Sequence, residues 1–266
     1  MKDSKGEIVL LTKIKKYRFL FEELVKRDFK KKYKGTFLGV LWSVLAPLLN
    51  VLVLNLVFSN FFAQRGAEVQ PFIIYIFSGT LVMSFYTECT QGCMRGLMAN
   101  ASIFSKINVP KYLFLLSKAF QSFINFMLTF VLYIVFCLIY RIQFGWHMLS
   151  LLYPMFWLLI FCFGVGMVLS ALYVFFRDVE YLYGVFLTLL NYVSAIFYPV
   201  SIIKNFQWIF YCNPVYVYIY YFRTVTMAGA IPSLEIHGLC AIYALVFLGI
   251  GCLIYKKCNH EFLYYV

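Results

Sequence analysis

The sequence contains little charge. Only 13% of its 266 residues are Asp, Glu, Lys or Arg, about half the share of soluble domains, while 63% are hydrophobic and the mean hydropathy is +0.82. A chain of this composition does not suit a surface of ordinary polarity, which excludes a water-soluble globular protein. Because the apolar stretches are long rather than short and alternating, they predict membrane-spanning helices.

Acidic residues are the scarcer charged class, with 11 Asp and Glu against 23 Lys and Arg, so the formal net charge is +12. Twelve of the basic residues lie before residue 35. There they can contact anionic lipid headgroups and orient the chain in a membrane. We therefore expect membrane lipids as partners of this basic segment, and no nucleic acid.

Several signals of catalysis and metal binding are missing. No GxxxxGK[ST] phosphate-binding loop occurs, so we do not expect the chain to bind ATP through that device. There is no HExxH motif, the three histidines are far apart, and the eight cysteines form no CxxC pair. The first 35 residues lack the apolar core of a cleavable signal peptide. We expect neither a catalytic residue nor a metal site on this chain.

The apolar stretches predict an all-α integral membrane protein with six transmembrane helices. A basic, amphipathic segment at 1–36 precedes a transmembrane domain at 37–266. Most of the remaining Lys and Arg residues fall in alternate connections, so both termini are expected in the cytoplasm. The spans are expected at about 37–62, 72–97, 113–140, 149–174, 183–200 and 236–255.

Residues 14–33 have the pattern of an interfacial helix. Apolar side chains such as Phe29 recur on one face, while Arg27 and Lys30 lie mostly opposite. Asp28 is the exception, because it falls on the apolar face. It is expected to pair with a neighbouring base or with a partner protein. A purely topology-setting basic segment is the alternative.

Polar residues within the spans need partners that lipid does not provide. Asn50 lies in the first span, and Thr188, Asn191 and Tyr198 share a face of the fifth. Such residues are expected to face other helices or an aqueous path. Glu88, deep in the second span, is either functional or a hydrogen-bonded structural residue. In the fourth span, small residues at 162, 166 and 170 predict close helix packing.

Two cytoplasmic connections and one outer region complete the pattern. Residues 91–112 contain a short helix with an apolar side, ended by Pro110. A tight turn holds Arg177, Asp178 and Glu180; this acidic pair is either a salt-bridged loop or the metal-diphosphate site of a transferase. Between residues 199 and 232 the chain is irregular and rich in aromatic residues, which favours short helices at the outer face.

Four segments together resemble a known family. Their order and spacing resemble those of the ABC-2 type permeases that export polysaccharides. The segments are LVKRDFKKKYKGTFLGVLWSVLAPLLNVLVLNLVFSNFF, which runs from the basic segment through the first span, followed by NASIFSKINVPKYLFLLS, FFRDVEYL and CNPVYVYIYYFR. These permeases are the membrane subunits of O-antigen, capsule and teichoic-acid exporters. The similarity covers nearly the whole chain. One departure is Val109–Pro110–Lys111, where the family usually has Phe-Pro-Arg.

The resemblance implies a homodimer bound to two copies of a separate ABC ATPase subunit. No cofactor is then expected on this chain, because ATP and Mg would bind the partner. The resemblance also implies a coupling helix at 98–108, a channel lined by the first and fifth spans, and an outer gate of short helices at 201–230, between spans five and six. The residues expected in these roles are Asn100, Ile103, Phe104, Ser105, Lys106, Ile107, Arg177 and Asp178 for ATPase coupling; Arg27, Asp28, Phe29 and Lys30 in the interfacial helix; Trp42, Asn50, Tyr86, Glu88, Thr188, Asn191 and Tyr198 in the channel; and Phe206, Trp208 and Tyr211 in the outer gate.

The function implied is export of a lipid-linked glycan or polyol-phosphate polymer through the bacterial cytoplasmic membrane, with ATP hydrolysis outside this chain. A small-amphiphile or drug exporter would share the fold. A membrane-embedded glycosyltransferase would depend on Asp178 and Glu180. A secondary transporter is disfavoured, because no internal repeat is evident and Glu88 is the only clear acidic candidate.

Overall fold

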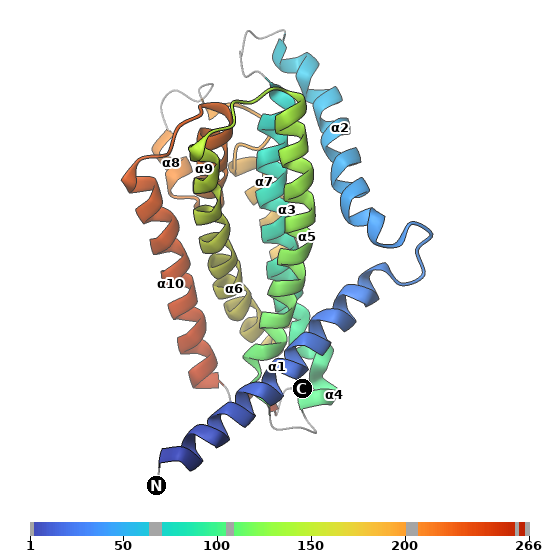
Figure 1. Ribbon diagram of the computed structural model, residues 1–266, viewed down its shortest axis with the longest axis vertical. Coiled ribbons are helices and arrows are strands. Elements are labelled where there is room, and N and C mark those ends of the chain that lie inside the picture. Colours follow the sequence, from blue (N-terminus) through green and yellow to red (C-terminus); the bar gives the residue numbers. More distant parts are fainter. Residues whose placement is uncertain (1–2, 64–70, 105–108, 201–206, 259–260, 264–266) are drawn as a thin grey trace.

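The computed structural model describes residues 3–63, 71–104, 109–200, 207–258 and 261–263, with side chains omitted for 3–16, 60–63, 104, 207 and 263. Throughout these residues the regular structure is helical. Figure 1 shows an upright bundle in which α3, α5 and α6 are central, α2 stands to one side and α10 to the other. The coarse prediction of an all-α fold is confirmed.

Five helical segments of the described chain are long and apolar enough to cross a membrane. They lie close to five of the six predicted spans. In chain order they comprise α2 (Trp42–Ala63) with the preceding turn η1 (Gly39–Leu41), α3 (Phe72–Gly96), α5 (Tyr112–Ile139), α6 (Leu152–Phe175) with the preceding turn η3 (Trp146–Leu151), and α10 (Leu234–Cys258).

The predicted fifth span at 183–200 differs most from the structure. Its helix, α7, runs from Val179 to Val193, which is only 15 residues and falls short of a full span. The chain turns at Ala195, whose φ is +49°. Arg223 donates to the carbonyl oxygens of Ala195 (2.9 Å) and Ile196 (3.2 Å). These carbonyl oxygens therefore accept hydrogen bonds from an arginine distant in the sequence, and not from the amides of a continuing helix. A sixth full span is not confirmed.

Two further helices follow α7 at the same end of the bundle. α8 (Gln207–Tyr211) is short, and α9 (Pro214–Met227) is a buried helix that packs on α3 and α10. Asn213 begins α9 as its N-cap, because its side chain accepts a hydrogen bond from the Val215 amide at 3.0 Å, and Pro214 occupies the first turn. The aromatic region thus contains the helices α8 and α9, but an outer gate formed by them stays a prediction, and Phe206 lies outside the described residues.

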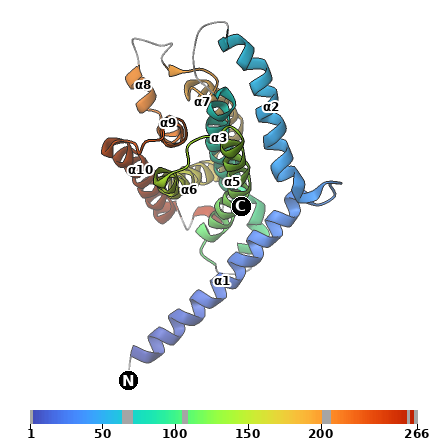
Figure 2. The same ribbon diagram turned by 45° about the horizontal axis from the view of Figure 1, so that its top comes forward.

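The first helix, α1 (Asp3–Tyr33), begins well before the predicted start at residue 14. It runs obliquely across the lower end of the bundle and meets α2 at a sharp corner, as Figures 1 and 2 both show. The short segments η2 (Met98–Asn100) and α4 (Ala101–Phe104) lie at this same end, as does the C-terminus. The short turn η5 (Glu261–Leu263) also packs there, with Phe262 against Phe175 and Tyr255.

The core lies where α3 packs on α5 and α6, and where α6 packs on α10. The predicted stripe of small residues on α6 is in these contacts, as expected. A Cβ atom at Gly166 would lie 2.5 Å from Cys93 Cβ of α3, and the Tyr255 hydroxyl of α10 donates to Ser170 at 3.0 Å. Small side chains here allow helix backbones to approach closely.

Gly164 gives a direct test of this packing. A Cβ atom there would lie 2.5 Å from the backbone nitrogen of Leu248, so Gly164→Val must push α6 and α10 apart. We expect a loss of about 1–3 kcal/mol of stability, typical of overpacked cores, and a lower melting temperature of the purified chain in detergent. Gly249→Val is the matched control, because nothing lies within 4 Å of a Cβ atom added at Gly249. Equal melting of both variants would contradict the packing described.

Candidate functional site

The interfacial helix α1 is joined to the bundle by a buried charge cluster. The carboxylate of Asp28 is 2% exposed; its Oδ1 accepts hydrogen bonds from Arg27, and its Oδ2 lies 3.0 Å from Lys118 Nζ of α5. A carboxylate this well buried is stable only when it is paired. The expectation that Asp28 pairs with a base is therefore confirmed, with two bases rather than one.

The same cluster reaches the predicted coupling segment. Arg27 Nη2 donates to Asn100 Oδ1 at 2.7 Å, and Asn100 Nδ2 donates to the Gly96 carbonyl, also at 2.7 Å. Asn100 is 1% exposed, and it lies where α3 ends and α4 begins. Any displacement of η2 and α4 must therefore move or break a contact with α1.

The other predicted coupling and interfacial residues have less specific surroundings. Ile103 packs against the core, Phe104 ends α4 without a described side chain, and Ser105, Lys106 and Ile107 lie outside the described residues. Arg177 and Asp178 are exposed in the turn before α7. Phe29 packs edge-on against Tyr33, and Lys30 is exposed. No described contact assigns these residues a role.

A cavity of about 540 Å³ with a mixed, mainly apolar lining lies between α2, α3, α5 and the end of α1. We call it the first cavity. Its lining combines hydroxyl and amide side chains with aromatic rings, namely Tyr33 and Thr36 beside α2 residues Trp42, Ser43 and Asn50, α3 residues Ser84 and Phe85, and α5 residues Ser122, Asn125, Phe126 and Thr129.

An ion pair completes that lining. Lys32 Nζ lies 2.8 Å from Glu88 Oε1, and the same oxygen accepts from Asn125 Nδ2 at 2.6 Å and Gln121 Nε2 at 3.4 Å. Tyr33 donates to Asn125 Oδ1 at 3.1 Å. Glu88 is thus hydrogen-bonded to structural neighbours, as one alternative predicted, and its side chain is one-third exposed to a cavity; a functional role for Glu88 stays a prediction.

A second cavity, of about 650 Å³, lies between α2, α3 and α7. Thr188, Asn191 and Tyr192 line it from α7, and Phe197 closes one side. It shares four lining residues with the first cavity: Lys32, Asn50, Ser84 and Glu88. The structure thus brings five of the seven predicted channel residues to the walls of two adjoining cavities: Trp42, Asn50, Glu88, Thr188 and Asn191.

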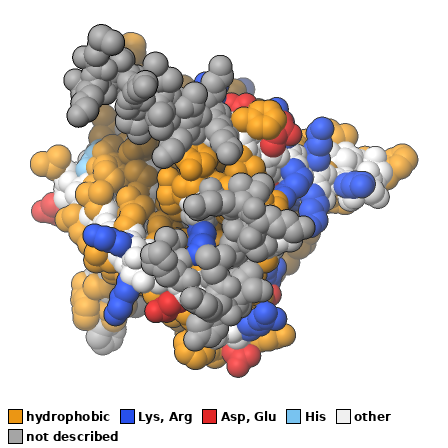
Figure 3. Space-filling view, turned by 90° about the horizontal axis from the view of Figure 1, so that it is seen from below, with side chains coloured by type: hydrophobic (Ala, Val, Ile, Leu, Met, Phe, Trp, Pro, Cys, Tyr) orange, Lys and Arg blue, Asp and Glu red, His pale blue; other side chains and the backbone are white. Residues whose placement is uncertain are grey.

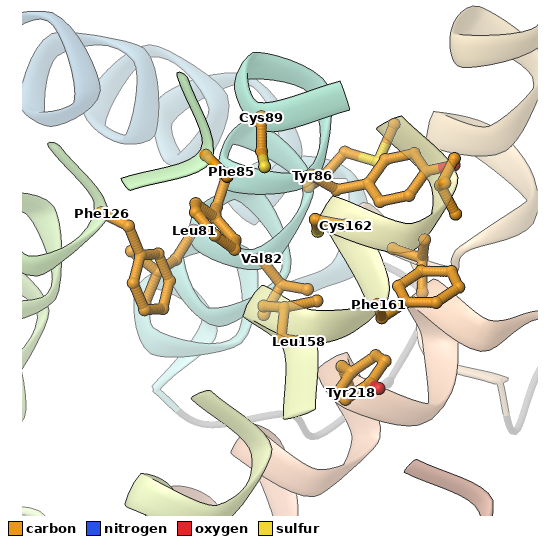
Figure 4. Close-up of a cluster of buried hydrophobic side chains, with 14 of the residues drawn as sticks. Leu81, Val82, Phe85, Tyr86, Cys89, Phe126, Leu158, Phe161, Cys162 and Tyr218 are labelled. Atoms are coloured by element: carbon orange, nitrogen blue, oxygen red, sulfur yellow. The ribbon is translucent and has the colours of Figure 1, made fainter. Parts of the chain in front are cut away.

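The other two predicted channel residues, Tyr86 and Tyr198, do not line either of these cavities. Tyr86 is 4% exposed and stacks on Phe161 of α6 in the hydrophobic core, which Figure 4 shows beside Cys162. It lines neither of these two cavities, so its predicted place in the channel has no support from them and stays a prediction. The reason is helix geometry, because Tyr86 falls on the face of α3 that packs against α6, whereas Ser84 and Glu88 face α2. Tyr198 follows the end of α7, and its hydroxyl donates to the Tyr192 carbonyl at 2.8 Å.

The two described residues of the predicted outer gate, Trp208 and Tyr211, have different surroundings. Trp208 in α8 is 65% exposed. Tyr211 is partly buried and packs against Tyr216 and Tyr220 of α9, and its carbonyl accepts from Tyr243 of α10 at 3.0 Å. Tyr211 is therefore part of a packed aromatic cluster, while Trp208 presents an open surface.

Three polar residues on α5 contact the candidate site but were not among the predicted site residues. Lys118, Gln121 and Asn125 contact Asp28 or Glu88, and they recur at helical spacing on one face of the third predicted span. That stripe was a usable signal. It resembles the stripe on the fifth span, and polar side chains in hydrocarbon indicate a buried or wet face in both cases.

The described residues contain no group of three His, Cys, Asp or Glu side chains that could hold a metal ion. Glu180, a candidate for transferase chemistry, forms an ion pair with Arg95 of α3. This contact agrees with the salt-bridged loop that the sequence left open as one alternative.

The sequence matches a known protein family and several known proteins. The family model described as ABC-2 type transporter matches residues 20–227. The chain is similar to an O-antigen export system permease protein, RfbA, of Klebsiella pneumoniae (26% identity, covering 92% of this chain and 95% of the relative) and to RfbA of Myxococcus xanthus (29%, covering 74% and 75%). It also resembles the polysialic acid transport protein KpsM of Escherichia coli (20%, covering 88% and 92%). This multi-pass membrane protein belongs to the ABC-2 type transporter family.

Proposed function

We propose that this chain is the membrane permease subunit of an ATP-driven exporter that carries a lipid-linked polysaccharide or teichoic-acid-type polymer out of the cytoplasm. The observation that carries the proposal is the pair of adjoining cavities, whose walls share the polar side chains of Lys32, Asn50, Ser84 and Glu88. Polar groups at membrane depth are costly unless they line a wet path or bind a polar ligand. The relatives named above include permeases for O-antigen and for polysialic acid, which are polysaccharides.

The proposal includes a homodimer. Large apolar side chains on the outer faces of α2 and α7 are exposed in the single chain, among them Leu56, Val185 and Leu189. The polar residues of the second cavity lie between these two helices. A second copy packed against α2 and α7 would enclose that cavity as a channel, which is the role that the family resemblance gives these helices.

Two copies of a separate ABC ATPase subunit complete the proposed assembly. ATP and Mg would bind that subunit, and its movement would reach this chain through η2 and α4. The Arg27–Asn100 hydrogen bond and the Asp28–Lys118 ion pair support this route, because they join that segment to α1 and α5. Figure 3, seen from below, shows Lys and Arg side chains outnumbering acids at this end, as expected of a cytoplasmic surface in the bacterial inner membrane.

The direct experiment is deletion of the gene in its own host. We expect loss of one surface polysaccharide and accumulation of the same polymer, still lipid-linked, inside the cell. Unchanged surface polymer together with new sensitivity to small amphiphiles would favour the drug-exporter alternative. Retained polymer synthesis in Asp178→Asn and Glu180→Gln variants would exclude the membrane transferase.

Glu88 gives a residue-level prediction for this function. Glu88→Leu removes the acceptor of Lys32, Asn125 and Gln121 together, leaving polar groups unpaired at the junction of both cavities. We expect at least a fivefold fall in the export rate, measured as surface polymer appearing after induction, with a normal amount of chain in the membrane. Glu235→Leu makes the same change at an exposed position on α10 and should export normally. Equal export by the two variants would contradict the role of the cavities.

A further inference from the structure

The first cavity has the chemistry of a ligand site within a single chain. Its charged lining residues, within the described chain, are Lys32 and Glu88, which lie 2.8 Å apart and neutralise one another. An anion would face the carboxylate and a cation would face the ammonium group. The cavity therefore favours a ligand that is polar but carries no net charge.

The remaining lining narrows the class of ligand. The hydroxyl groups of Ser84 and Ser122 share this lining with the indole ring of Trp42, which is 40% exposed and so open to contact. A lipid tail would place these hydroxyl groups and the Lys32–Glu88 ion pair against hydrocarbon, which costs free energy. Sugar rings suit such a mixed wall, because their hydroxyl groups hydrogen-bond while their CH faces contact aromatic rings. The volume, about 540 Å³, lies within the range of about 300–1,000 Å³ for ligand pockets.

From these observations we propose that the first cavity binds a short stretch of a neutral, hydroxyl-rich glycan, held between α2 and α5 of one chain. This inference rests on the proposed export function and adds a specific holding site. Because the two cavities share Lys32, Asn50, Ser84 and Glu88, a glycan bound in the first cavity would adjoin the second cavity, which α7 lines.

Photocrosslinking in exporting cells tests the site with the cell's own polymer as the probe. Benzoylphenylalanine replaces Ala46, which lines the first cavity; Asn191, which lines only the second; or Val131, which lines neither and is exposed on the opposite face of α5. We expect a glycan adduct, seen as a size shift detected by a lectin or antiserum against the polymer, at 46 and none at 131.

Absence of the adduct at 46 overturns the inference. In that case an adduct at 191 leaves the proposed export function standing, while absence at both positions in cells that still display polymer counts against both proposals. A filling variant provides a second measurement: Ala46→Trp should lower export at least fivefold, whereas Val131→Trp should not change it. Normal export by a stably inserted Ala46→Trp chain would also overturn the inference.

Discussion

Replacing Arg223 by leucine is expected to remove most of the folded protein from the membrane. Arg223 is 7% exposed, and its guanidinium group donates to the carbonyls of Ala195 (2.9 Å), Ile196 (3.2 Å) and Tyr75 (3.2 Å). It also lies 3.4 Å from the centroid of the Tyr75 ring. Each buried carbonyl left without its donor costs about 1–3 kcal/mol, so the sum is comparable with a typical stability of about 5–15 kcal/mol.

The measurement is the amount of monodisperse chain recovered in detergent, together with its melting temperature. Arg18→Leu makes the same change at a side chain that is 77% exposed, and it should alter neither quantity. Arg223→Lys should recover only part of the loss, because one ammonium group cannot reproduce the planar fork that reaches three carbonyls. Wild-type recovery of Arg223→Leu would show that this arginine does not hold the chain between α7 and α8.

The second large effect concerns the buried pair of Asp28 and Lys118. Asp28→Leu leaves Lys118, which is 20% exposed, without its carboxylate, and it removes one of the two side-chain acceptors of Arg27, whose hydrogen bond to Asn100 remains. Breaking one side of a buried pair costs about 3–5 kcal/mol. Because the pair joins α1 to α5, we expect lower stability and detachment of α1, detected as faster proteolysis within 17–33.

A double-mutant cycle separates this pair from its surroundings. The double variant Asp28→Leu with Lys118→Met should be more stable than the sum of the single effects predicts, by about 2–3 kcal/mol, because neither charge then remains buried alone. Glu22→Leu is the control, since Glu22 lies on the exposed side of the same helix and pairs with Arg18. Strict additivity in the Asp28 and Lys118 cycle would show that their 3.0 Å approach contributes no coupling.

Hydropathy predicted the long spans well, because a run of apolar residues in lipid has no alternative to the helix. The second span was expected at 72–97 and α3 ends at Gly96. The fifth span was mispredicted for a physical reason. Residues 194–200 are apolar enough to continue a helix, yet the chain turns at Ala195, where Arg223 takes up the carbonyls. A contact between residues 28 positions apart in the sequence leaves no local signal.

The candidate site could likewise be predicted only in part from the sequence. The sequence indicated that Asp28 and Glu88 need partners, because a charge on an apolar face is costly. It did not indicate which partners, since Lys118 and Lys32 lie 90 and 56 residues away, respectively. Tyr86 packs in the core and does not line the first cavity beside Glu88, because a residue two positions away lies on a different face of the helix. The coupling, channel and gate roles stay predictions.

The measurement that tests the account most directly is purification of the tagged chain from its native membrane, with ATPase assay and identification of bound proteins. We predict an ABC ATPase subunit in equal proportion, and loss of that subunit or of coupled ATP hydrolysis in an Ile103→Asp variant that still folds. A chain that purifies alone, folded and at full yield, with no ATPase, would contradict the exporter assignment.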